Sequence, residues 1–399
     1  MSWKWNSDQR LVIEEAVNHV LHPTSEQIYQ FSGAAGTGKT EVLKEIIRRI
    51  NSPFSKVAAM AYIGQAANVM RSRGILSART AHSWLYELRE APVLEEDGTP
   101  VIDPVFNRPK MRYEFIPRNL SDIDYVIVDE SYTFPLRMKK DVINTGKPII
   151  ATGDVNQLPP VKDKPAFLVE GKIRYLRQIM RQSGDSDIPY IADRILHGKP
   201  ISTGLYRGVL VIEEKDLTDE MIRNSNIVIC GTNKTRDNYN SYIREKILGF
   251  HTRLPSLNER IICRKNNWNL ELDGISLTNG LVGQVTKAPD VESFDGRQFF
   301  IDFKPDLMHS TFMNLGCDYD YFIADYTKRN EIKSSPFSVG EKFEFAYAVT
   351  THLSQGAQYP SGIYIHELLR RDIQKNLDYT GVTRFKKFLI YVIPNKKYF

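Results

Sequence analysis

Short apolar runs alternate along the chain with segments of helical periodicity, a pattern that predicts a parallel sheet covered by helices. The runs at 27–31, 125–128 and 147–152 have the length and apolar character of buried strands. The segment 40–50 instead spaces its apolar residues at helical intervals, so that they share one face. Strands and helices in this alternation indicate an α/β lobe over residues 1–185.

The pattern changes twice, which predicts one insertion in each of two lobes. Residues 88–117 combine prolines, an Asp-Gly turn pair and alternating apolar residues, so we expect a β-hairpin that leaves the first lobe. A second α/β lobe, residues 186–399, contains short alternating strands from about 257 to 340, separated by Asn-Gly and Asp-Gly turns. We expect a small β-barrel there.

Composition and charge indicate which partners and which compartment suit the protein, but not which reaction it catalyses. The 399 residues are 42% hydrophobic and 25% charged, with a formal net charge of +5, which permits an anionic polymer as partner. Cys230, Cys263 and Cys317 are too far apart in sequence for a metal-type pair, so we expect buried thiols in a reducing compartment. The sequence has neither a signal peptide nor an apolar run near the roughly 18 residues of a membrane span. We therefore expect a cytoplasmic protein without a membrane partner.

The loop after the first predicted strand has the pattern G-x-x-x-x-G-K-[ST], which predicts a phosphate cradle. Backbone N–H groups surround a phosphate chain where small residues leave room. The strand before the loop and the helix after it are the setting that this motif requires, with the helix N-terminus directed at the anion. Lys39 is predicted to reach the β- and γ-phosphates of ATP, and Thr40 to hold Mg²⁺. The predicted loop residues are Gly33, Ala34, Ala35, Gly36, Thr37, Gly38, Lys39 and Thr40.

Polar residues at two further strand ends would complete such a site. Asp129 and Glu130 follow the run 125–128, at the sheet edge where α/β proteins bind ligands. We expect Asp129 to hold Mg²⁺ through water, and Glu130 to orient and deprotonate the attacking water. Gln157 follows the next strand, and its amide is suited to contact a γ-phosphate and a water together.

Six segments occur in a recognisable order: GAAGTGKT, VIVDES, GDVNQLPPV, QIMRQ, TTHLSQG and YTGVTRFKK. They resemble the motifs of superfamily 1 DNA helicases of the RecD/Dda branch, small phage-type helicases of the Dda kind most of all. The resemblance extends from Gln9 to about Lys387, although the inserts between the motifs match poorly. It implies two RecA-like lobes with ATP between them, a strand-separating pin in the first lobe and an SH3-like barrel in the second.

Two of these segments indicate the branch. Gln-Leu-Pro-Pro after Gly-Asp differs from the Gln-Ser-Ile-Tyr of UvrD/Rep-like enzymes, which move 3′ to 5′. Val382-Thr383-Arg384 resembles the RecD/Dda ending more than the Ala-Leu-Ser-Arg of the Pif family. The resemblance therefore implies 5′-to-3′ translocation on single-stranded DNA, a direction that neither composition nor periodicity shows.

The resemblance also assigns residues to ATP. Gln9 matches the family's adenine-reading glutamine, and Arg181 and Arg384 match the two arginines that contact the γ-phosphate. One bidentate cation from each lobe would make ATP the link between the lobes. The expected catalytic residues are Lys39, Glu130, Gln157, Arg181 and Arg384.

Other positions match segments that contact the DNA backbone or couple it to ATP. Small polar residues around two histidines are suited to phosphate contacts, and no proton transfer is expected from either histidine. Phe106 is the expected apolar tip of the hairpin, where it would meet the first base pair; a hairpin that only covers the lobe is the alternative. The expected DNA-contacting residues are Tyr62, Gln65, Thr80, His82, Phe106, Asn233, Thr351, His352, Ser354 and Gln355.

One segment departs from the family pattern. Where the family has Ala-Pro-Thr-Gly-Lys-Ala-Ala, this chain has Tyr62, Ile63 and Gln65 in place of Pro, Thr and Lys. A hydroxyl and a cation suited to phosphate contact are therefore missing. Tyr62 has two interpretations, stacking on a base, worth roughly 1–3 kcal/mol, or ordinary packing at a strand end.

The resemblance favours an ATP-dependent helicase that acts as a monomer on single-stranded DNA and duplex junctions in a bacterial or phage-infected cell. Replication or recombination proteins are candidate partners. One alternative is an RNA-active member of the same superfamily, which the activating nucleic acid would distinguish. Another is a DNA-stimulated ATPase that remodels protein–DNA complexes without separating strands. A nucleotide kinase is disfavoured because the later motifs would then have no purpose.

Overall fold

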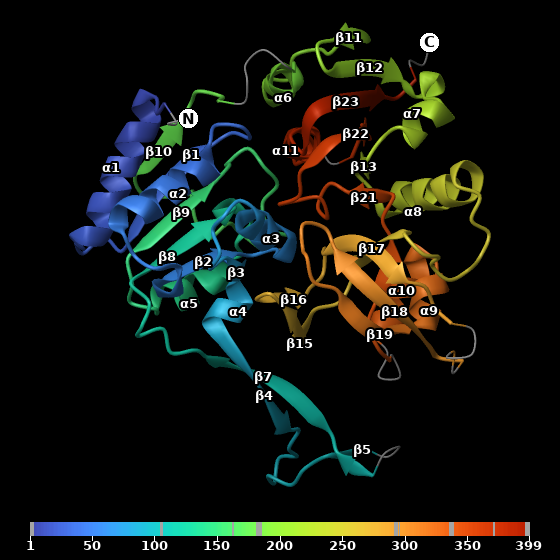
Figure 1. Cartoon of the computed structure of the whole chain (residues 1–399), viewed down its shortest axis with the longest axis horizontal. Helices are drawn as coiled ribbons and strands as arrows, with labels where there is room; N and C mark the ends of the chain where they lie inside the picture. The colour runs from blue at the N-terminus through green and yellow to red at the C-terminus, as the bar shows by residue number, and fades with distance from the viewer. Residues whose placement is uncertain are drawn as a thin grey trace.

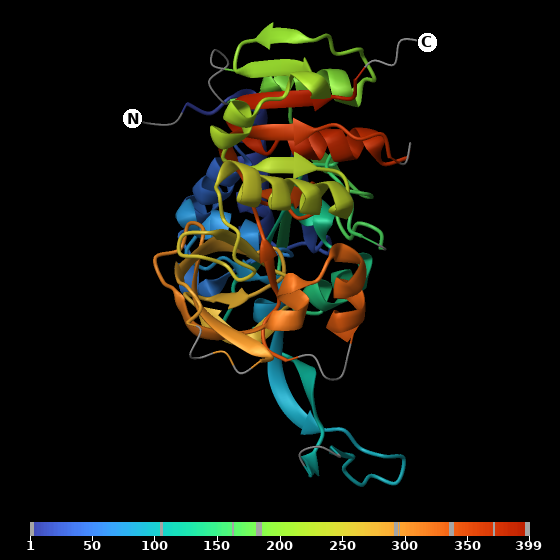
Figure 2. The same ribbon diagram turned by 90° about the vertical axis from the view of Figure 1, so that its right-hand side faces the viewer.

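Two mainly parallel six-stranded sheets form the body of the molecule, and a narrow two-stranded ribbon projects from it (Figure 1, Figure 2). The computed structural model describes residues 4–103, 107–161, 163–180, 186–290, 294, 296–334, 339–369 and 372–395. Among these residues, no helix has the length and apolar character needed to cross a membrane.

The first sheet is wholly parallel and has the strand order β10-β1-β9-β8-β2-β3. The sheet is buried on both faces, as a parallel sheet requires. Its residues alternate accordingly, with Ala59 of β2 in one core and Ala58 and Met60 in the other. The strands are β1 (Ile28–Gly33), β2 (Val57–Ala61), β3 (Arg79–Thr80), β8 (Tyr125–Asp129), β9 (Ile149–Gly153) and β10 (Ile173–Leu176).

Helices cover both faces of this sheet. The first core contains residues of α1 (Ser7–Leu21), α2 (Lys39–Ile50) and α3 (Gly64–Ser72), and the second contains residues of α4 (Ala81–Leu85) and α5 (Lys139–Ile143). The buried side chains of α2 confirm the helical face predicted for 40–50. Short 3₁₀ turns are η1 (Phe54–Lys56), η2 (Ser131–Thr133) and η3 (Leu136–Met138).

The second sheet has the order β11-β12-β23-β22-β13-β21 and is parallel except for the edge pair β11–β12. Helices α6 (Ile188–Leu196) and α11 (Gln374–Val382) pack in one core, and α7 (Asp219–Arg223) in the other. Helix α8 (Asn233–Tyr242) continues into a π turn, η5 (Ile243–Ile247), and η4 spans Glu214–Asp216. The strands are β11 (Gly204–Tyr206), β12 (Val209–Glu213), β13 (Val228–Cys230), β21 (Ala348–Thr350), β22 (Tyr359–Ile365) and β23 (Phe385–Ile393).

The ribbon leaves the first sheet after α4. Strand β4 (Tyr86–Pro92) pairs antiparallel with β7 (Met111–Pro117), and β5 (Ile102–Asp103) pairs with β6 (Arg108–Pro109) farther out. In both views the ribbon extends away from the two sheets (Figure 1, Figure 2). It begins at residue 86, two residues before the predicted hairpin. Phe106, the predicted tip, lies outside the described residues.

The second insertion is a five-stranded antiparallel sheet with the order β19-β18-β17-β14-β20. Its edges meet at a single-residue bridge between Cys317 and Glu341. A separate hairpin, β15 (Asn267–Leu272) with β16 (Ile275–Leu277), reaches α3 of the first lobe, so one core runs from lobe to insertion. The remaining elements are β14 (Arg260–Cys263), β17 (Val282–Lys287), β18 (Gln298–Pro305), β19 (Phe312–Asp318), α9 (Tyr319–Ile323), α10 (Tyr326–Ser334) and β20 (Phe343–Phe345).

Candidate functional site

The loop between β1 and α2 has the backbone that a phosphate cradle needs. Gly36 and Gly38 have φ angles of 92° and 87°, which side chains with a β-carbon rarely adopt. A Cβ on Gly33 would lie 2.4 Å from Thr37 Oγ1, so this position also accepts only glycine. Lys39 Nζ donates to the carbonyls of Gly33 at 2.7 Å and Ala34 at 3.4 Å, which holds its ammonium over the loop.

A cavity of about 340 Å³ opens from this loop toward the second lobe. The first lobe contributes the loop, the end of β8 and Gln157, and the second lobe contributes residues after β21 and α11. Positively and negatively charged side chains therefore line the same cavity. Its charged lining residues are Lys39, Glu41, Arg73, Asp129, Glu130, Arg384 and Lys386.

The predicted acidic pair stands at the end of β8, on the wall of this cavity. Asp129 is 7% exposed, and burial together with the neighbouring charge of Glu130 raises its pKa to about 6, against the opposing effect of Lys39 and Arg73. Its Oδ1 accepts a hydrogen bond from the Glu130 N–H at 2.9 Å. Glu130 has a φ angle of 47°, a left-handed conformation that costs backbone energy and is found most often at functional sites.

Gln157 lies on a loop that is hydrogen-bonded to the second lobe. Its side chain is buried, and its Oε1 has no hydrogen-bond partner among the described residues. Tyr379 of α11 donates to Asp154 Oδ2 at 2.7 Å, and the Leu158 N–H donates to Thr380 Oγ1 at 2.9 Å. Contacts from lobe two therefore hold the loop on both sides of Gln157.

The two predicted arginines have different outcomes. Arg384 lines the cavity, is almost wholly buried, and donates from Nε to the Thr380 carbonyl at 3.0 Å. Arg181 lies outside the described residues, and its role stays a prediction.

Gln9 is engaged with the loop. It is fully buried, and its Nε2 donates to the Thr37 carbonyl at 3.0 Å while its Oε1 accepts from the Asn6 N–H at 3.2 Å. It is not among the described residues that line the cavity. Gln9 therefore supports the phosphate loop in this structure, and its contact with adenine stays a prediction.

These residues fit Mg-ATP. A β-carbon would clash at Gly33 and would be strained at Gly36 and Gly38, and the pKa of the nearby Asp129 carboxyl is raised by burial, as expected for a group that binds a cation. Thr40 and Asp129 are the side chains that would hold Mg²⁺, and Lys39 with the loop backbone would hold the phosphates.

Arg73 is one of the residues of this cavity that were not predicted from the sequence. Arg73, at the C-terminal end of α3, donates from Nη1 to Thr40 Oγ1 at 3.2 Å and from Nη2 to Gln358 Oε1 at 2.5 Å. It therefore joins the phosphate loop to the second lobe across the cavity. No motif contains Arg73, and its α3 is recognisable only as a helix, so the sequence offered no indication of this role.

A second cavity, of about 610 Å³, also lies between the lobes and is called the cleft below. Its walls come from the two lobes and from the loops of the second insertion. Among the described residues that line it, none is an aspartate or a glutamate. Those residues are Tyr62, Ile63, Thr133, Pro135, Arg137, Pro160, Val161, Gly231, Thr232, Asn233, Arg264, Asn279, Thr350, His352, Leu353 and Gln355.

The predicted DNA-contacting residues divide between this cleft and the interior. Four of them line the cleft, namely Tyr62, Asn233, His352 and Gln355. Four others are buried, and three of them have local contacts: Thr80 Oγ1 accepts from the Ser83 N–H, and the hydroxyls of Thr351 and Ser354 donate to the carbonyls of Cys230 and Thr351. The fourth, Gln65, is also buried.

His82 lies at the base of the ribbon in an aromatic contact between lobe and insertion. Its ring stacks on Trp268 of β15, with centroids 4.7 Å apart and planes at 29°, and Phe115 of β7 lies at the edge of both. Burial lowers the pKa of His82 to about 4, and the charge of Arg137 adds to the effect. Trp268 was not predicted, because no sequence pattern connects β15 to α4.

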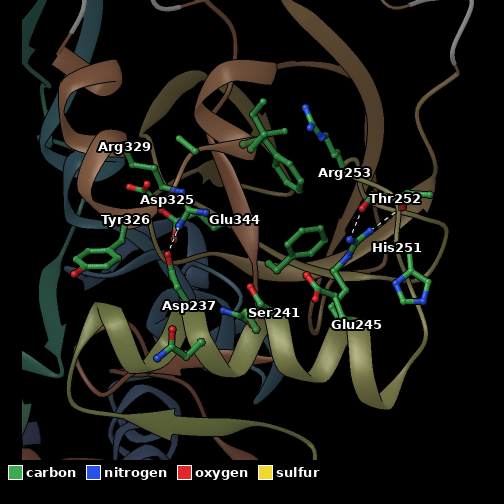
Figure 3. Close-up of a pocket in the computed structure, with 17 residues that line it drawn as sticks. Asp237, Ser241, Glu245, His251, Thr252, Arg253, Asp325, Tyr326, Arg329 and Glu344 are labelled. Carbon is green, nitrogen blue, oxygen red and sulfur yellow. Dashed lines mark hydrogen bonds and ion pairs between the residues drawn. The ribbon is translucent and has the colours of Figure 1, made fainter.

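A larger cavity, of about 740 Å³, lies between α8 and α10, and a cluster of ion pairs forms part of its wall (Figure 3). Arg329 lies 2.9 Å from Asp237 and 3.4 Å from Glu344. Burial raises the pKa of Glu344, but the charges of Arg264, Arg236 and Arg329 together lower it to about 2. This cluster joins the second insertion to α8.

Solved structures share the fold over nearly the whole chain. One, described as two coordinating Pif1 helicases in DNA unwinding at forked double-stranded DNA, aligns with a TM-score of 0.58 at 16% identity and covers 98% of this chain and 92% of that one. Bacteroides Pif1 bound to single-stranded DNA aligns with a TM-score of 0.56 at 15% identity, with coverages of 98% and 92%. Bacteroides Pif1 in complex with ADP-AlF3 and single-stranded DNA aligns with a TM-score of 0.53 at 14% identity, with the same coverages.

At these identities the likeness concerns the fold, and it confirms the predicted α/β architecture with a P-loop core. The closer resemblance of Val382-Thr383-Arg384 to the RecD/Dda branch than to the Pif family stays a prediction. No curated protein matches the chain in sequence. Residues 4–214, more than half of the chain, match the family model described as AAA domain. The chain therefore belongs to the AAA domain family.

Proposed function

We propose that the protein is an ATP-dependent DNA helicase of superfamily 1, which moves 5′ to 3′ along single-stranded DNA and separates the strands of a duplex junction. The proposed motor lobes are residues 1–185 and 186–399. The observation that carries the proposal is the loop of residues 154–161. It contributes Gln157 to the cavity of about 340 Å³ beside the phosphate loop, called the nucleotide cavity below, and Pro160 and Val161 to the cleft.

The residues of the nucleotide cavity that match the predicted motifs then have separate tasks. When bound, ATP supplies the reacting phosphate, and Mg²⁺ neutralises part of its charge. Lys39 leaves the carbonyls that hold it and binds the phosphates together with the loop backbone. Glu130 orients the attacking water and takes its proton on a carboxylate oxygen, and the unpaired Oε1 of Gln157 holds the same water. Arg384 binds the γ-phosphate from the second lobe, and we assign the same task to Arg181.

The effect of ATP hydrolysis is transmitted to the cleft through the loop of residues 154–161. The Leu158 carbonyl accepts a hydrogen bond from Gln355 Nε2 at 3.0 Å, and Gln355 lines the cleft. Leu158 is the direct neighbour of Gln157, so a shift of Gln157 on phosphate release moves the partner of Gln355. Opening and closing of the lobes in each cycle would alternate their grip on the strand.

The cleft is suited to a sequence-tolerant grip on one strand. Tyr62 offers an aromatic face, and Asn233, His352 and Gln355 offer polar groups without an opposing carboxylate on the described walls. Binding should therefore rest on stacking and on phosphate contacts, and should weaken with salt. The buried residues Gln65, Thr80, Thr351 and Ser354 shape the walls and reach the strand only if the walls rearrange.

We assign strand separation to the two insertions. The ribbon β4–β7 is the proposed pin, with Phe106 at its tip, and the five-stranded sheet is the proposed SH3-like barrel. Support comes from the contact of Trp268, on the barrel side, with His82 and Phe115 at the base of the ribbon. Such a contact would fix the angle of the pin relative to the cleft.

Strand separation on tailed duplexes tests this proposal. One duplex has only a 5′ single-stranded tail and the other only a 3′ tail, and Lys39→Ala is the inactive control. The proposal predicts ATP-dependent separation of the 5′-tailed duplex alone. Separation of the 3′-tailed duplex alone contradicts the assigned direction. ATP hydrolysis stimulated by DNA, without separation of either duplex, favours the remodelling ATPase, and stimulation by RNA instead of DNA favours the RNA-active alternative.

A further inference from the structure

The 3₁₀ turn η3 places an arginine on the first-lobe wall of the cleft. Arg137 is exposed, and its Nη2 donates to the Tyr62 hydroxyl at 3.4 Å. Its charge also acts on His82, the neighbour of Tyr62 in the aromatic cluster. Arg137 follows the acidic pair of β8 by only seven residues in sequence, yet the turns η2 and η3 carry it from the nucleotide side to the cleft.

Arg137 is the cation of this cleft whose charge has no local compensation. The other arginine of the lining, Arg264, donates to Glu344 at 3.0 Å and to Asn279 at 3.1 Å. In the described part of the chain, no carboxylate lies within ion-pair distance of Arg137. An exposed guanidinium without an ion-pair partner attracts an anion, because no adjacent carboxylate neutralises its field.

The residues expected to bind phosphate are poorly placed to do so. Gln65, Thr80 and Ser354 are each less than 5% exposed, and Thr80 and Ser354 are engaged in local hydrogen bonds. The segment around Gln65 also lacks the lysine and threonine of the related pattern. A cation for the strand must therefore come from another element of the same wall, and Arg137 projects beside Tyr62 at that wall.

We propose that Arg137 binds a backbone phosphate of single-stranded DNA in the cleft, supplying from η3 the positive charge that the Tyr62–Gln65 segment lacks. The inference rests on the proposed function and names a residue of its DNA-binding site. A guanidinium presents two parallel N–H donors to phosphate oxygens, so Arg137 can keep its contact while the strand advances past Tyr62. No bond is made or broken in this step.

Salt-dependent binding tests the inference. The full-length wild type, Arg137→Ala, Arg137→Lys and Arg223→Ala are titrated against a fluorescent oligothymidylate between about 50 and 200 mM salt, and affinity is read from anisotropy. Arg223 is an exposed arginine of α7 outside the cleft and is the matched control. Thermal unfolding of each variant checks that the fold is retained.

Arg137→Ala is expected to bind about tenfold more weakly than the wild type, the effect of losing roughly one charge-assisted hydrogen bond. The slope of log affinity against log salt should fall by about 0.7, the value for one phosphate contact on a single strand. Arg137→Lys should keep the slope, because it keeps the charge. It should lose part of the affinity, because an ammonium lacks the paired N–H donors of the guanidinium. Arg223→Ala should match the wild type in both quantities.

Two results overturn the inference. One is an Arg137→Ala protein with the affinity and slope of Arg223→Ala. The other is an affinity loss with an unchanged slope, which would mean that Arg137 acts through Tyr62 and not on a phosphate. A wild type that fails to bind the oligonucleotide, or whose ATP hydrolysis ignores it, contradicts the proposed function itself. That failure is seen without any Arg137 variant.

Discussion

The nucleotide cavity and the cleft both lie between the two lobes, yet they differ in their charges. The nucleotide cavity sets Lys39 and Arg384 against Asp129 and Glu130 within about 340 Å³. The cleft is lined by arginine, amide, hydroxyl and aromatic groups, with no carboxylate among its described lining residues. Acids are needed where a metal ion is held and a water is activated, but an acid beside a moving strand would repel its phosphates.

Size alone would have identified the wrong place. The cavity between α8 and α10 is larger than either, at about 740 Å³, but Glu344 and Asp237 in its wall pair with Arg329 (Figure 3). Its charges stabilise the joint between the second lobe and its insertion. Volume therefore does not distinguish the two proposed functional cavities from this one, whereas the match of their lining residues to the predicted motifs does.

The largest expected effect comes from Lys39→Ala. Removing the phosphate-binding ammonium should lower the rate of ATP hydrolysis by about a thousandfold or more, the scale of losing a cation at a transferring phosphoryl group. Affinity for single-stranded DNA should stay within a few-fold of the wild type, because Lys39 does not line the cleft. Steady-state hydrolysis and anisotropy measure the two, with the exposed Lys56→Ala as control. Full ATP turnover by Lys39→Ala would remove the distinction between the cavities.

Arg73→Ala is expected to have the next largest effect. Arg73 joins Thr40 to Gln358 across the nucleotide cavity, so its loss should lower kcat for ATP by roughly tenfold, the worth of one charge-assisted hydrogen bond. Gln358→Ala should reproduce a smaller part of the loss, because it breaks the same contact and leaves the charge. Unchanged kcat with a raised KM would show that Arg73 contributes only to binding.

Trp268→Ala separates the pin from the motor. The stack on His82 is worth about 0.5 to 1.5 kcal/mol, so loss of Trp268 should slow strand separation several-fold while hydrolysis on single-stranded DNA changes less than about twofold. The two assays on one preparation give the ratio. Equal losses in both would argue that Trp268 serves the cleft and not the ribbon. Phe106→Ala should show the same separation of the two activities.

The smallest expected effect is on stability and depends on pH. The pKa of His82 is lowered to about 4 by burial, so the unfolded chain binds a proton more readily than the folded one between pH 4 and 6.5. The stabilisation is therefore complete above about pH 6.5 and is lost as pH falls toward 4. In His82→Gln, the loss of unfolding free energy over this range should shrink by about 1 to 2 kcal/mol. Denaturant unfolding at several pH values measures it, and an unchanged profile contradicts a buried, neutral His82.

The nucleotide cavity was largely predictable because its chemistry is local in sequence. A phosphate loop needs glycines at fixed spacings, and Asp129 and Glu130 follow a strand whose apolar run is unmistakable. The buried positions of Val42 and Ile46 also followed from the helical period alone. Arg73 was not predictable in the same way, since its partner Gln358 is distant in the chain and the contact exists only after folding.

The cleft was predicted less completely. Motif matches located Tyr62, His352 and Gln355, but they did not show that Thr80 and Thr351 would turn inward to the backbone. Burial of a small polar side chain depends on the packing of several elements, which a single sequence pattern does not contain. For the same reason the position of Arg137 in the cleft could not be predicted, because it depends on how the turn η3 packs in the folded protein.

The proposed coupling between the nucleotide cavity and the cleft runs through the loop of residues 154–161. The most direct test measures ATP hydrolysis against single-stranded DNA concentration for the wild type and for Gln355→Ala, which loses the contact with the Leu158 carbonyl. The account predicts strong stimulation of the wild type by DNA, and a variant that binds DNA within a few-fold of the wild type but gains little stimulation. A wild type whose hydrolysis does not respond to DNA, or a variant stimulated as fully as the wild type, would contradict it.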